Sequence, residues 1–346
     1  MNLLQRILKT IDSEGPIPFE RFMEHALYDR EGFYGGAALR SQKAGDFLTS
    51  PEVSPLFGET LAVFVERELD RIGEPFQLVE VGAGSGSLLR PLLAKVDVEA
   101  WAVEASPPAR ERLTEILPAH RVLSELPETI RGVVLANELM DNLPMAIAQK
   151  IDGRWRERWV GRDGDGLGFV DAEPRPEVVA WLDAYAGDVD DGGWVEVQLR
   201  AQEWLRNTLR RLKAGSLLII DYGETAENLL PRRRDGTLRT YRAHHLGPHP
   251  LDEPGETDIT ADVNFTALVA TAEATGARVS LHRQDDFLAS LGLREQLSEM
   301  RHAELAAARS GDEMERLRLR SLKTEAETLL HPRGLGDFRV LVASKP

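Results

Sequence analysis

The chain contains 346 residues, of which 42% are hydrophobic and 29% are charged, as is typical of a soluble globular protein. Its formal net charge of −15 disfavours nucleic acid and anionic membranes as partners. The absence of cysteine excludes disulfides, thiolate metal ligands and cysteine nucleophiles. No apolar run approaches the roughly 20 residues of a membrane helix, and the amphipathic start is too short in apolar residues for a signal peptide. We therefore expect a cytoplasmic protein without a membrane-inserted segment.

Residues 1–75 predict a helical extension that packs on the domain after it. We expect a helix over residues 19–27. Ser50 is predicted to cap a longer helix, because Pro51 and Glu52 would then occupy its first turn and Gly73 would end it.

From residue 76 onward, apolar segments of strand length alternate with helical segments, which predicts an α/β domain over residues 76–346. Because these strands are apolar throughout, we expect a mainly parallel, Rossmann-like sheet covered by helices on both faces. Strands near 277–283 and 338–344 are expected to close the sheet as an antiparallel pair. The other strands are predicted at residues 76–81, 99–104, 132–137 and 216–221, with a helix at 88–95.

Two segments interrupt this alternation. Residues 146–197 predict an insertion over the sheet edge or the active site. They contain a hairpin signal, Asp152-Gly153, between two strand patterns. Residues 231–262 are long, polar and rich in turns, which predicts a lid-like loop. A metal site is the alternative interpretation of this loop, and we prefer the lid because no ligand geometry is specified by its histidines, His244, His245 and His249.

Three glycines follow the first strand of the predicted sheet. Gly82, Gly84 and Gly86 have no Cβ atom, so the backbone there can turn tightly and approach a ligand closely. The next helix would offer free N–H groups to a carboxylate. Glu104 ends the second strand, 22 residues after Gly82, where an acidic side chain accepts hydrogen bonds from ribose hydroxyls. The combination predicts a site for an adenosyl ligand.

The spacing of these residues bears on which adenosyl ligand is bound. A dinucleotide fingerprint has glycine where this chain has Ser87, and Glu80 precedes the turn, so S-adenosylmethionine (SAM) is favoured over NAD. An NAD-dependent oxidoreductase and a purely structural glycine turn remain the alternatives. The residues predicted to bind SAM are Glu80, Gly82, Ala83, Gly84, Ser85, Gly86, Glu104, Ala105, Ser124, Glu125 and Asn137, with Ser50 and Pro51 from the N-terminal part.

Polar residues come directly after the strand at 132–137. Asn137, Glu138 and Asp141 are predicted to orient the substrate beside the transferable methyl group, and the alternative is acidic capping of a helix that starts there. Asp221 ends another strand and either lines the cleft or caps the next turn. Tyr34 and Glu52 are secondary candidates, with a capping role equally open for Glu52.

Five separated motifs resemble the MidA-like family of SAM-dependent methyltransferases. They are Gly45-Asp46-Phe47-Leu48-Thr49-Ser50-Pro51-Glu52, the turn at 80–86, Ala136-Asn137-Glu138-Leu139-Met140-Asp141-Asn142-Leu143-Pro144, Ile220-Asp221-Tyr222-Gly223 and the segment at 258–266. The resemblance implies the seven-stranded class I methyltransferase fold. Mitochondrial members assist assembly of respiratory complex I by dimethylating an arginine of one subunit, which implies a protein substrate such as a respiratory complex subunit.

The resemblance has one departure that affects the expected site. Where family members tend to have histidine in Thr-Ala-His-Val-Asp-Phe, this chain has Asp262, so no histidine role carries over. If the acceptor is a guanidinium, Glu138 and Asp141 would hold it by paired hydrogen bonds and localise its charge away from the reacting nitrogen. The alternatives are a SAM-binding assembly protein without turnover and a methyltransferase that acts on a small molecule.

Overall fold

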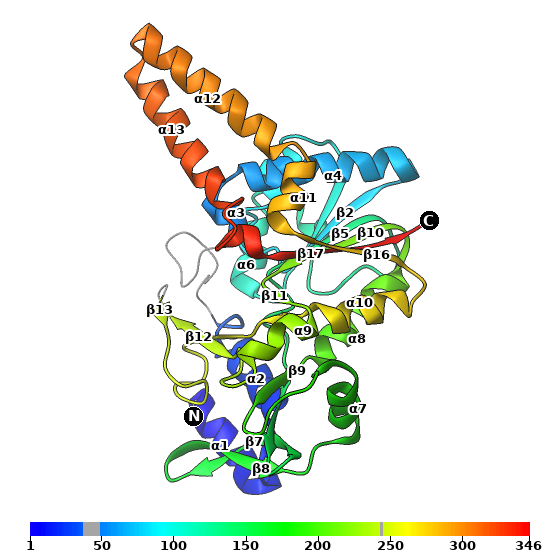
Figure 1. Ribbon diagram of the computed structural model, residues 1–346, viewed down its shortest axis with the longest axis vertical. Helices are drawn as coiled ribbons and strands as arrows, with labels where there is room; N and C mark the ends of the chain where they lie inside the picture. Colours follow the sequence, from blue (N-terminus) through cyan, green and yellow to red (C-terminus); the bar gives the residue numbers. More distant parts are fainter. Residues whose placement is uncertain (37–48, 243–244) are drawn as a thin grey trace.

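A computed structural model describes residues 1–36, 49–242 and 245–346 of the chain (Figure 1). The first part of one predicted motif, Gly45-Asp46-Phe47-Leu48, and His244 lie outside the described residues. No helix within the described residues is both long and apolar enough to cross a membrane.

A seven-stranded sheet forms the centre of the upper half of the molecule in Figure 1. Its strand order is β16-β17-β10-β5-β2-β3-β4, and β17 runs antiparallel between β10 and β16 while the other neighbours are parallel. The parallel strands and the closing antiparallel pair predicted from the sequence are therefore confirmed. The strands are β2 (Gln77–Val81), β3 (Glu99–Val103), β4 (Val122–Leu123), β5 (Ile130–Asn137), β10 (Leu212–Asp221), β16 (Arg278–Arg283) and β17 (Arg339–Lys345).

Helices cover both faces of this sheet, because its strands are apolar on both sides. Leu78 and Val133 point to the layer that contains α4 (Leu56–Ile72), whereas the adjacent Val79 and Val134 point to the layer that contains α8 (Leu199–Arg211). This alternation follows from the two-residue period of a strand. The remaining helices around the sheet are α5 (Leu89–Leu93), α6 (Pro107–Leu113), η1 (Ala119–Arg121), α10 (Phe265–Glu273), α11 (Gln284–Ser290) and η3 (Leu335–Asp337).

A second, antiparallel sheet lies below the first in Figure 1 and comes mainly from the predicted insertion. The hairpin with Asp152-Gly153 at its turn is confirmed, since Ile151 pairs with Arg154. Helices α1 and α2 pack on this sheet, whereas α4 packs on the main one, so the described helices of the N-terminal part contact both layers. The elements are α1 (Leu3–Glu14), β1 (Ile17–Pro18), α2 (Phe19–Tyr28), β6 (Ala146–Ile151), β7 (Arg154–Asp163), β8 (Gly166–Ala172), α7 (Pro176–Tyr185) and β9 (Trp194–Val197).

The prediction of one long helix capped by Ser50 is wrong, because another residue is the cap and the helix is interrupted. Thr49 is the N-cap of a single turn, α3 (Ser50–Val53), and α4 begins only at Leu56. Pro55 explains the break, because a proline restricts the residue before it to extended backbone, and Ser54 has φ −150° and ψ 134°. Gly73 ends α4 as predicted.

The segment predicted as a lid-like loop contains regular structure of its own. Its strands β12 (Arg239–Arg242), β13 (His245–Leu246) and β14 (Asp258–Thr260) form a three-stranded sheet, in which Thr240 pairs with Ile259. β-Branched and aromatic residues at these positions favour strands, a signal that the turn-rich composition of the segment concealed. Shorter elements precede and follow it: β11 (Gly223–Glu224), α9 (Ala226–Leu229), η2 (Leu230–Arg232) and β15 (Val263–Asn264).

Near the C-terminus, α12 (Leu293–Ser310) and α13 (Glu313–Thr328) form a helical hairpin that projects from the body in Figure 1. Lys323 Nζ donates to Glu304 at 2.5 Å between its helices.

Candidate active site

A cavity of about 430 Å³ opens at the carboxyl ends of β2, β3 and β5. This volume is typical of sites for small ligands, and the edge of the sheet is where parallel α/β folds bind them. Residues that line the cavity come from the glycine turn, from the ends of the neighbouring strands and from α8, and two tyrosines of the N-terminal part, Tyr28 and Tyr34, complete it.

The glycine turn has backbone angles that residues with side chains rarely adopt. Gly82, Gly84 and Gly86 have φ of 70°, 51° and 76°. At Gly86 a Cβ atom would also lie 2.3 Å from Cδ1 of Ile116. The chain therefore needs glycine here to bring its backbone around the cavity.

Glu104 connects the turn to the next strand end. Its two carboxylate oxygens accept the backbone N–H groups of Gly84 and Ser106, each at 2.8 Å. Burial raises the pKa of Glu104, and these two hydrogen bonds oppose the rise. Each oxygen retains acceptor capacity, so a ligand hydroxyl can be bound without breaking the contacts that fix the side chain.

Glu80 is the strongest sign that the cavity receives a donor-bearing ligand. Its side chain is buried, and Oε2 has no hydrogen-bond partner among the described residues. The same holds for Oδ1 of Asn137. Burial, with Glu104 nearby, raises the pKa of Glu80 to about 8. Buried oxygens without partners are costly in a folded protein, which indicates that ligand donors such as an ammonium group satisfy them.

A second cavity of about 760 Å³ adjoins the first, and Glu138 and Asn142 line both. The wall between the two cavities is thus made by the segment that follows β5. The other residues of the second cavity are Asp141, Tyr222, Gly223, Arg232, Arg239, Tyr241, Asp258, Asp262, Pro332, Arg333, Gly334, Asp337 and Phe338.

Glu138 is held in an uncommon backbone conformation, with φ of 49°. Its N–H donates to the carbonyl of Ile220 at 2.8 Å, and its Oε1 accepts from the N–H of Ser50 at 3.2 Å and from Nδ2 of Asn137 at 3.3 Å. Burial raises the pKa of Glu138 to about 8, and the nearby Asp141 adds to the rise. A carboxyl group is therefore fixed at the junction of the cavities.

Asp141 lies in the second cavity, bound to two hydroxyl groups. Its Oδ2 accepts from Thr260 Oγ1 at 2.7 Å and from the hydroxyl of Tyr222. Burial raises the pKa of Asp141 to about 6. Oδ1 of Asp141 has no hydrogen-bond partner among the described residues and remains open to a donor.

The interpretation of this segment as a helix start is wrong. Residues after Glu138 form a turn that leads into β6, and Asp221 supplies the stabilisation that a helix cap would have given. Its carboxylate accepts the N–H groups of Met140 at 2.9 Å, Asp141 at 3.3 Å and Tyr222 at 2.9 Å. Asp221 is fully buried, so of its two predicted roles the capping of a turn is the one that the structure shows.

Asp258 joins the N-terminal tyrosines to this segment. Its Oδ1 accepts from Tyr34 Oη and from Asn142 Nδ2, each at 2.9 Å. Tyr28 stacks on Tyr34 with ring centroids 5.8 Å apart and donates its hydroxyl to the carbonyl of Asn142 at 3.1 Å. Burial, with Asp141 nearby, raises the pKa of Asp258 to about 7.

Most of the residues predicted to bind SAM lie at one place in the structure. Ser50, Ser85 and Gly86 lie outside the cavity lining given by the described residues. Glu52 accepts the N–H of Thr49 at 3.4 Å, as a capping residue does. The predicted residues that line the first cavity are Pro51, Glu80, Gly82, Ala83, Gly84, Glu104, Ala105, Ser124, Glu125 and Asn137.

Several lining residues had no predicted role. Trp204, Asn207 and Arg211 reach the first cavity from α8. Their spacing of three and four residues places them on one helix face, but that pattern by itself indicates only packing. Tyr28 and Asp258 lay within or beside segments already singled out, without a signal for contact between them. Among the described residues no group of three or more histidine or acidic side chains is arranged to hold a metal ion.

The comparisons with known proteins agree with this geometry. A family model described as "Putative S-adenosyl-L-methionine-dependent methyltransferase" matches residues 60–282, more than half of the chain. The chain belongs to this methyltransferase family. The resemblance drawn from the five motifs is thereby confirmed, and SAM is the cofactor of the family.

Relatives of this methyltransferase match most of the chain. The mitochondrial protein arginine methyltransferase NDUFAF7 of Homo sapiens is 29% identical over an alignment of 335 residues, gaps included, which covers 84% of this chain and 73% of the relative. Its Drosophila melanogaster homolog is 29% identical over an alignment of 320 residues that covers 80% of this chain and 71% of the relative. A crystal structure from Burkholderia thailandensis, bound to S-adenosyl-homocysteine, has a TM-score of 0.87 at 31% identity and covers 99% of this chain and 92% of that chain. The α/β methyltransferase fold is therefore shared with a protein that binds the product of SAM.

Proposed function

We propose that this methyltransferase transfers methyl groups from SAM to an arginine side chain of a partner protein. The observation that carries the proposal is the position of Glu138, whose carboxyl group lies where the SAM cavity meets a second cavity. Asp141 and Asp258 extend the row of carboxyl groups into the second cavity. The relatives named as protein arginine methyltransferases support the acceptor class. A respiratory complex subunit as the partner and a cytoplasmic location remain predictions from the sequence.

The residues of the first cavity fit SAM by their chemistry. Glu80 and Asn137 would bind the amino group, since their buried oxygens have no partner among the described residues. Glu104 would accept the ribose hydroxyls. Bound there, SAM supplies an electrophilic methyl group whose transfer needs no acid for the leaving thioether.

Glu138 and Asp141 would act on the acceptor. A guanidinium is a poor nucleophile because its charge is delocalised and its pKa lies above about 12. Paired hydrogen bonds to carboxylates draw that charge toward the nitrogens that do not react and align the one that does. As the new N–C bond forms and the C–S bond breaks, the attacking nitrogen would lose a proton, and the carboxylate of Glu138 would accept it.

Methyl transfer in a cell extract tests the proposal. The protein is incubated with labelled SAM and an extract from a strain that lacks its gene, and we expect one labelled protein whose label is recovered as methylarginine. Glu138→Gln and Asp141→Asn are each expected to lower turnover by about 100-fold or more with unchanged SAM affinity. Glu227→Gln is the matched control, since Glu227 is exposed and lines neither cavity.

Three outcomes would contradict the proposal. Full turnover in both variants would remove the carboxylates from the mechanism. Label in a small molecule would assign a different acceptor. Tight SAM binding with no transfer to any component of the extract would support an assembly protein without turnover.

A further inference from the structure

Three arginines line the exposed part of the second cavity, and we call Arg232, Arg239 and Arg333 the arginine rim. The side chains of Arg232 and Arg239 are 42% and 39% exposed, and Arg333 is exposed as well. By contrast, Asp141 and Asp258 of the same cavity are buried. The cavity therefore has carboxyl groups at its inner end and guanidinium groups toward solvent.

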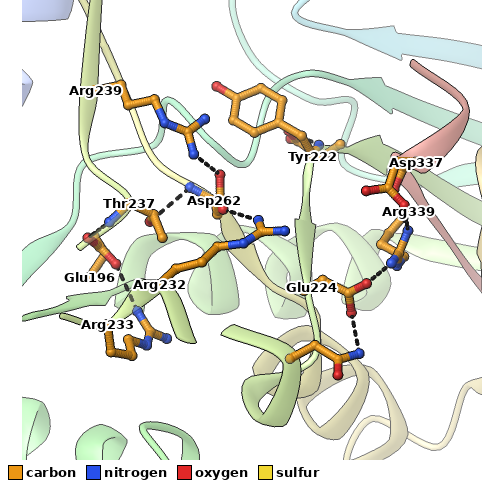
Figure 2. Close-up of polar contacts among 12 residues, drawn as sticks. Glu196, Tyr222, Glu224, Arg232, Arg233, Thr237, Arg239, Asp262, Asp337 and Arg339 are labelled. Carbon is orange, nitrogen blue, oxygen red and sulfur yellow. Dashed lines mark hydrogen bonds and ion pairs between the residues drawn. The ribbon is translucent and has the colours of Figure 1, made fainter. Parts of the chain in front are cut away.

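The arginine rim carries more positive charge than its neighbours neutralise. Arg232 and Arg239 both pair with the single buried carboxylate of Asp262, and Figure 2 shows them reaching it from two sides. Arg333 has no ion pair within the described part of the chain. The remaining acidic residue toward solvent, Asp337, is already paired with Arg283 and Arg339.

Two of the three rim arginines, Arg232 and Arg239, flank a backbone segment that is held in position before any ligand binds. Between Arg232 and Arg239, the buried Arg233 pairs with Glu196 of β9 at 2.8 Å. The same carboxylate accepts the backbone N–H of Thr237 at 2.6 Å (Figure 2). Because Glu196 holds the backbone segment between Arg232 and Arg239, the guanidinium groups of these two arginines lose little conformational freedom when they bind an anion.

We propose that the acceptor segment carries an aspartate or glutamate close to the target arginine, and that the arginine rim binds this acidic side chain while the inner carboxyl groups bind the arginine. The local positive charge is unexpected for a protein of net charge −15, and an uncompensated guanidinium favours a carboxylate over a neutral side chain. The proposal rests on the proposed arginine methyltransfer, and it adds the sequence context that the enzyme would select.

A set of short peptides tests this selectivity. Each contains one arginine in an alanine-rich sequence, with glutamate, alanine or lysine at one of the four positions on either side. Methyl transfer from labelled SAM and binding by fluorescence anisotropy are measured for every peptide. We expect the best glutamate peptide to have a kcat/KM about fivefold above its alanine counterpart and further above its lysine counterpart.

A charge swap at the rim separates recognition from folding. Arg333→Glu is expected to remove the advantage of the glutamate peptide and to favour the lysine peptide, whereas Arg234→Glu, also exposed but outside the cavity, leaves the preference unchanged. SAM affinity and the unfolding midpoint, measured in both variants, check that the fold is retained. Equal use of the three peptide types, or a preference that Arg333→Glu does not alter, would overturn the inference. If acidic peptides bind by the rim but no arginine is methylated, the proposed function fails and the binding inference stands.

Discussion

The backbone N–H of Ser50 donates a hydrogen bond of 3.2 Å to Oε1 of Glu138, so a segment near the N-terminus fixes a carboxyl group at the end of β5. Asn137 donates to the same oxygen at 3.3 Å. Oε1 of Glu138 thus accepts two hydrogen bonds from within the protein, and these contacts fix the orientation of the whole carboxyl group.

The activity should depend on pH through Glu138. Its pKa is raised to about 8, so the carboxyl group is mostly protonated in the free enzyme below that pH and becomes able to bind a guanidinium above it. We expect kcat/KM to rise with pH through about 8. The rise should disappear in Glu138→Gln, whose residual rate is low at every pH. The measurement is a kcat/KM profile from pH 6 to 10, and an unchanged rise in the variant would assign it to another group.

Replacement of Glu80 by glutamine should weaken the binding of SAM. The variant loses the charge that pairs with the ammonium group, and we expect the Kd to rise by about 10- to 100-fold. Isothermal titration calorimetry measures this directly. Glu99→Gln, an exposed position on the neighbouring strand β3, provides the control and should bind SAM as the parent does.

The same Glu80→Gln variant should be more stable than the parent at high pH in the absence of SAM. The folded-state pKa of Glu80 is about 8, above its unfolded value, so the stability it contributes is complete below the unfolded pKa and is lost as pH rises through about 8. We expect the variant to gain on the order of 1–3 kcal/mol in free energy of unfolding at pH 8–9. Urea unfolding at pH 5 and pH 9 checks the sign, and a larger gain at pH 5 would contradict the raised pKa.

Two glycines with similar φ angles allow the energetic cost of backbone strain to be measured separately from the cost of steric overlap. Gly86 and Gly153 have φ of 76° and 71°, but only a Cβ at Gly86 meets a neighbour, 2.3 Å away on Ile116, while none lies within 4 Å at Gly153. Gly153→Ala is expected to cost about 1 kcal/mol and Gly86→Ala about 1–2 kcal/mol more. Denaturant unfolding of both variants tests this order, and equal costs would show that Ile116 moves aside freely.

Asp221 should support turnover without touching either substrate. Asp221→Ala leaves three backbone N–H groups without their acceptor, and we expect a loss of about 2–3 kcal/mol in free energy of unfolding and a lower kcat. The exposed Asp286→Ala should change stability by less than about 0.5 kcal/mol. A stable Asp221→Ala protein with normal kcat would show that the turn keeps its shape by other contacts.

Local sequence patterns predicted the features that depend on residues close together in the chain. The apolar strands and the glycine turn at 82–86 follow from periodicity and from the lack of a Cβ, and the structure contains both. The alternative interpretation of a helix start after β5 is wrong, because the group that stabilises this turn, Asp221, lies more than eighty residues away in the chain. The contacts of Asp258 with Tyr34 and Asn142 could not be predicted either, because no local sequence pattern indicates which of three distant segments contact one another.

The position of β17 has a consequence for how the chain reaches its folded state. Residues 339–345 pair on one side with β10 and on the other with β16, so they join strands made earlier in synthesis. Until they emerge from the ribosome, β10 presents an unpaired edge and β16 has no neighbour in the main sheet. The cofactor-binding sheet is thus completed late and through contacts distant in sequence, which favours slow folding and exposes the nascent protein to aggregation.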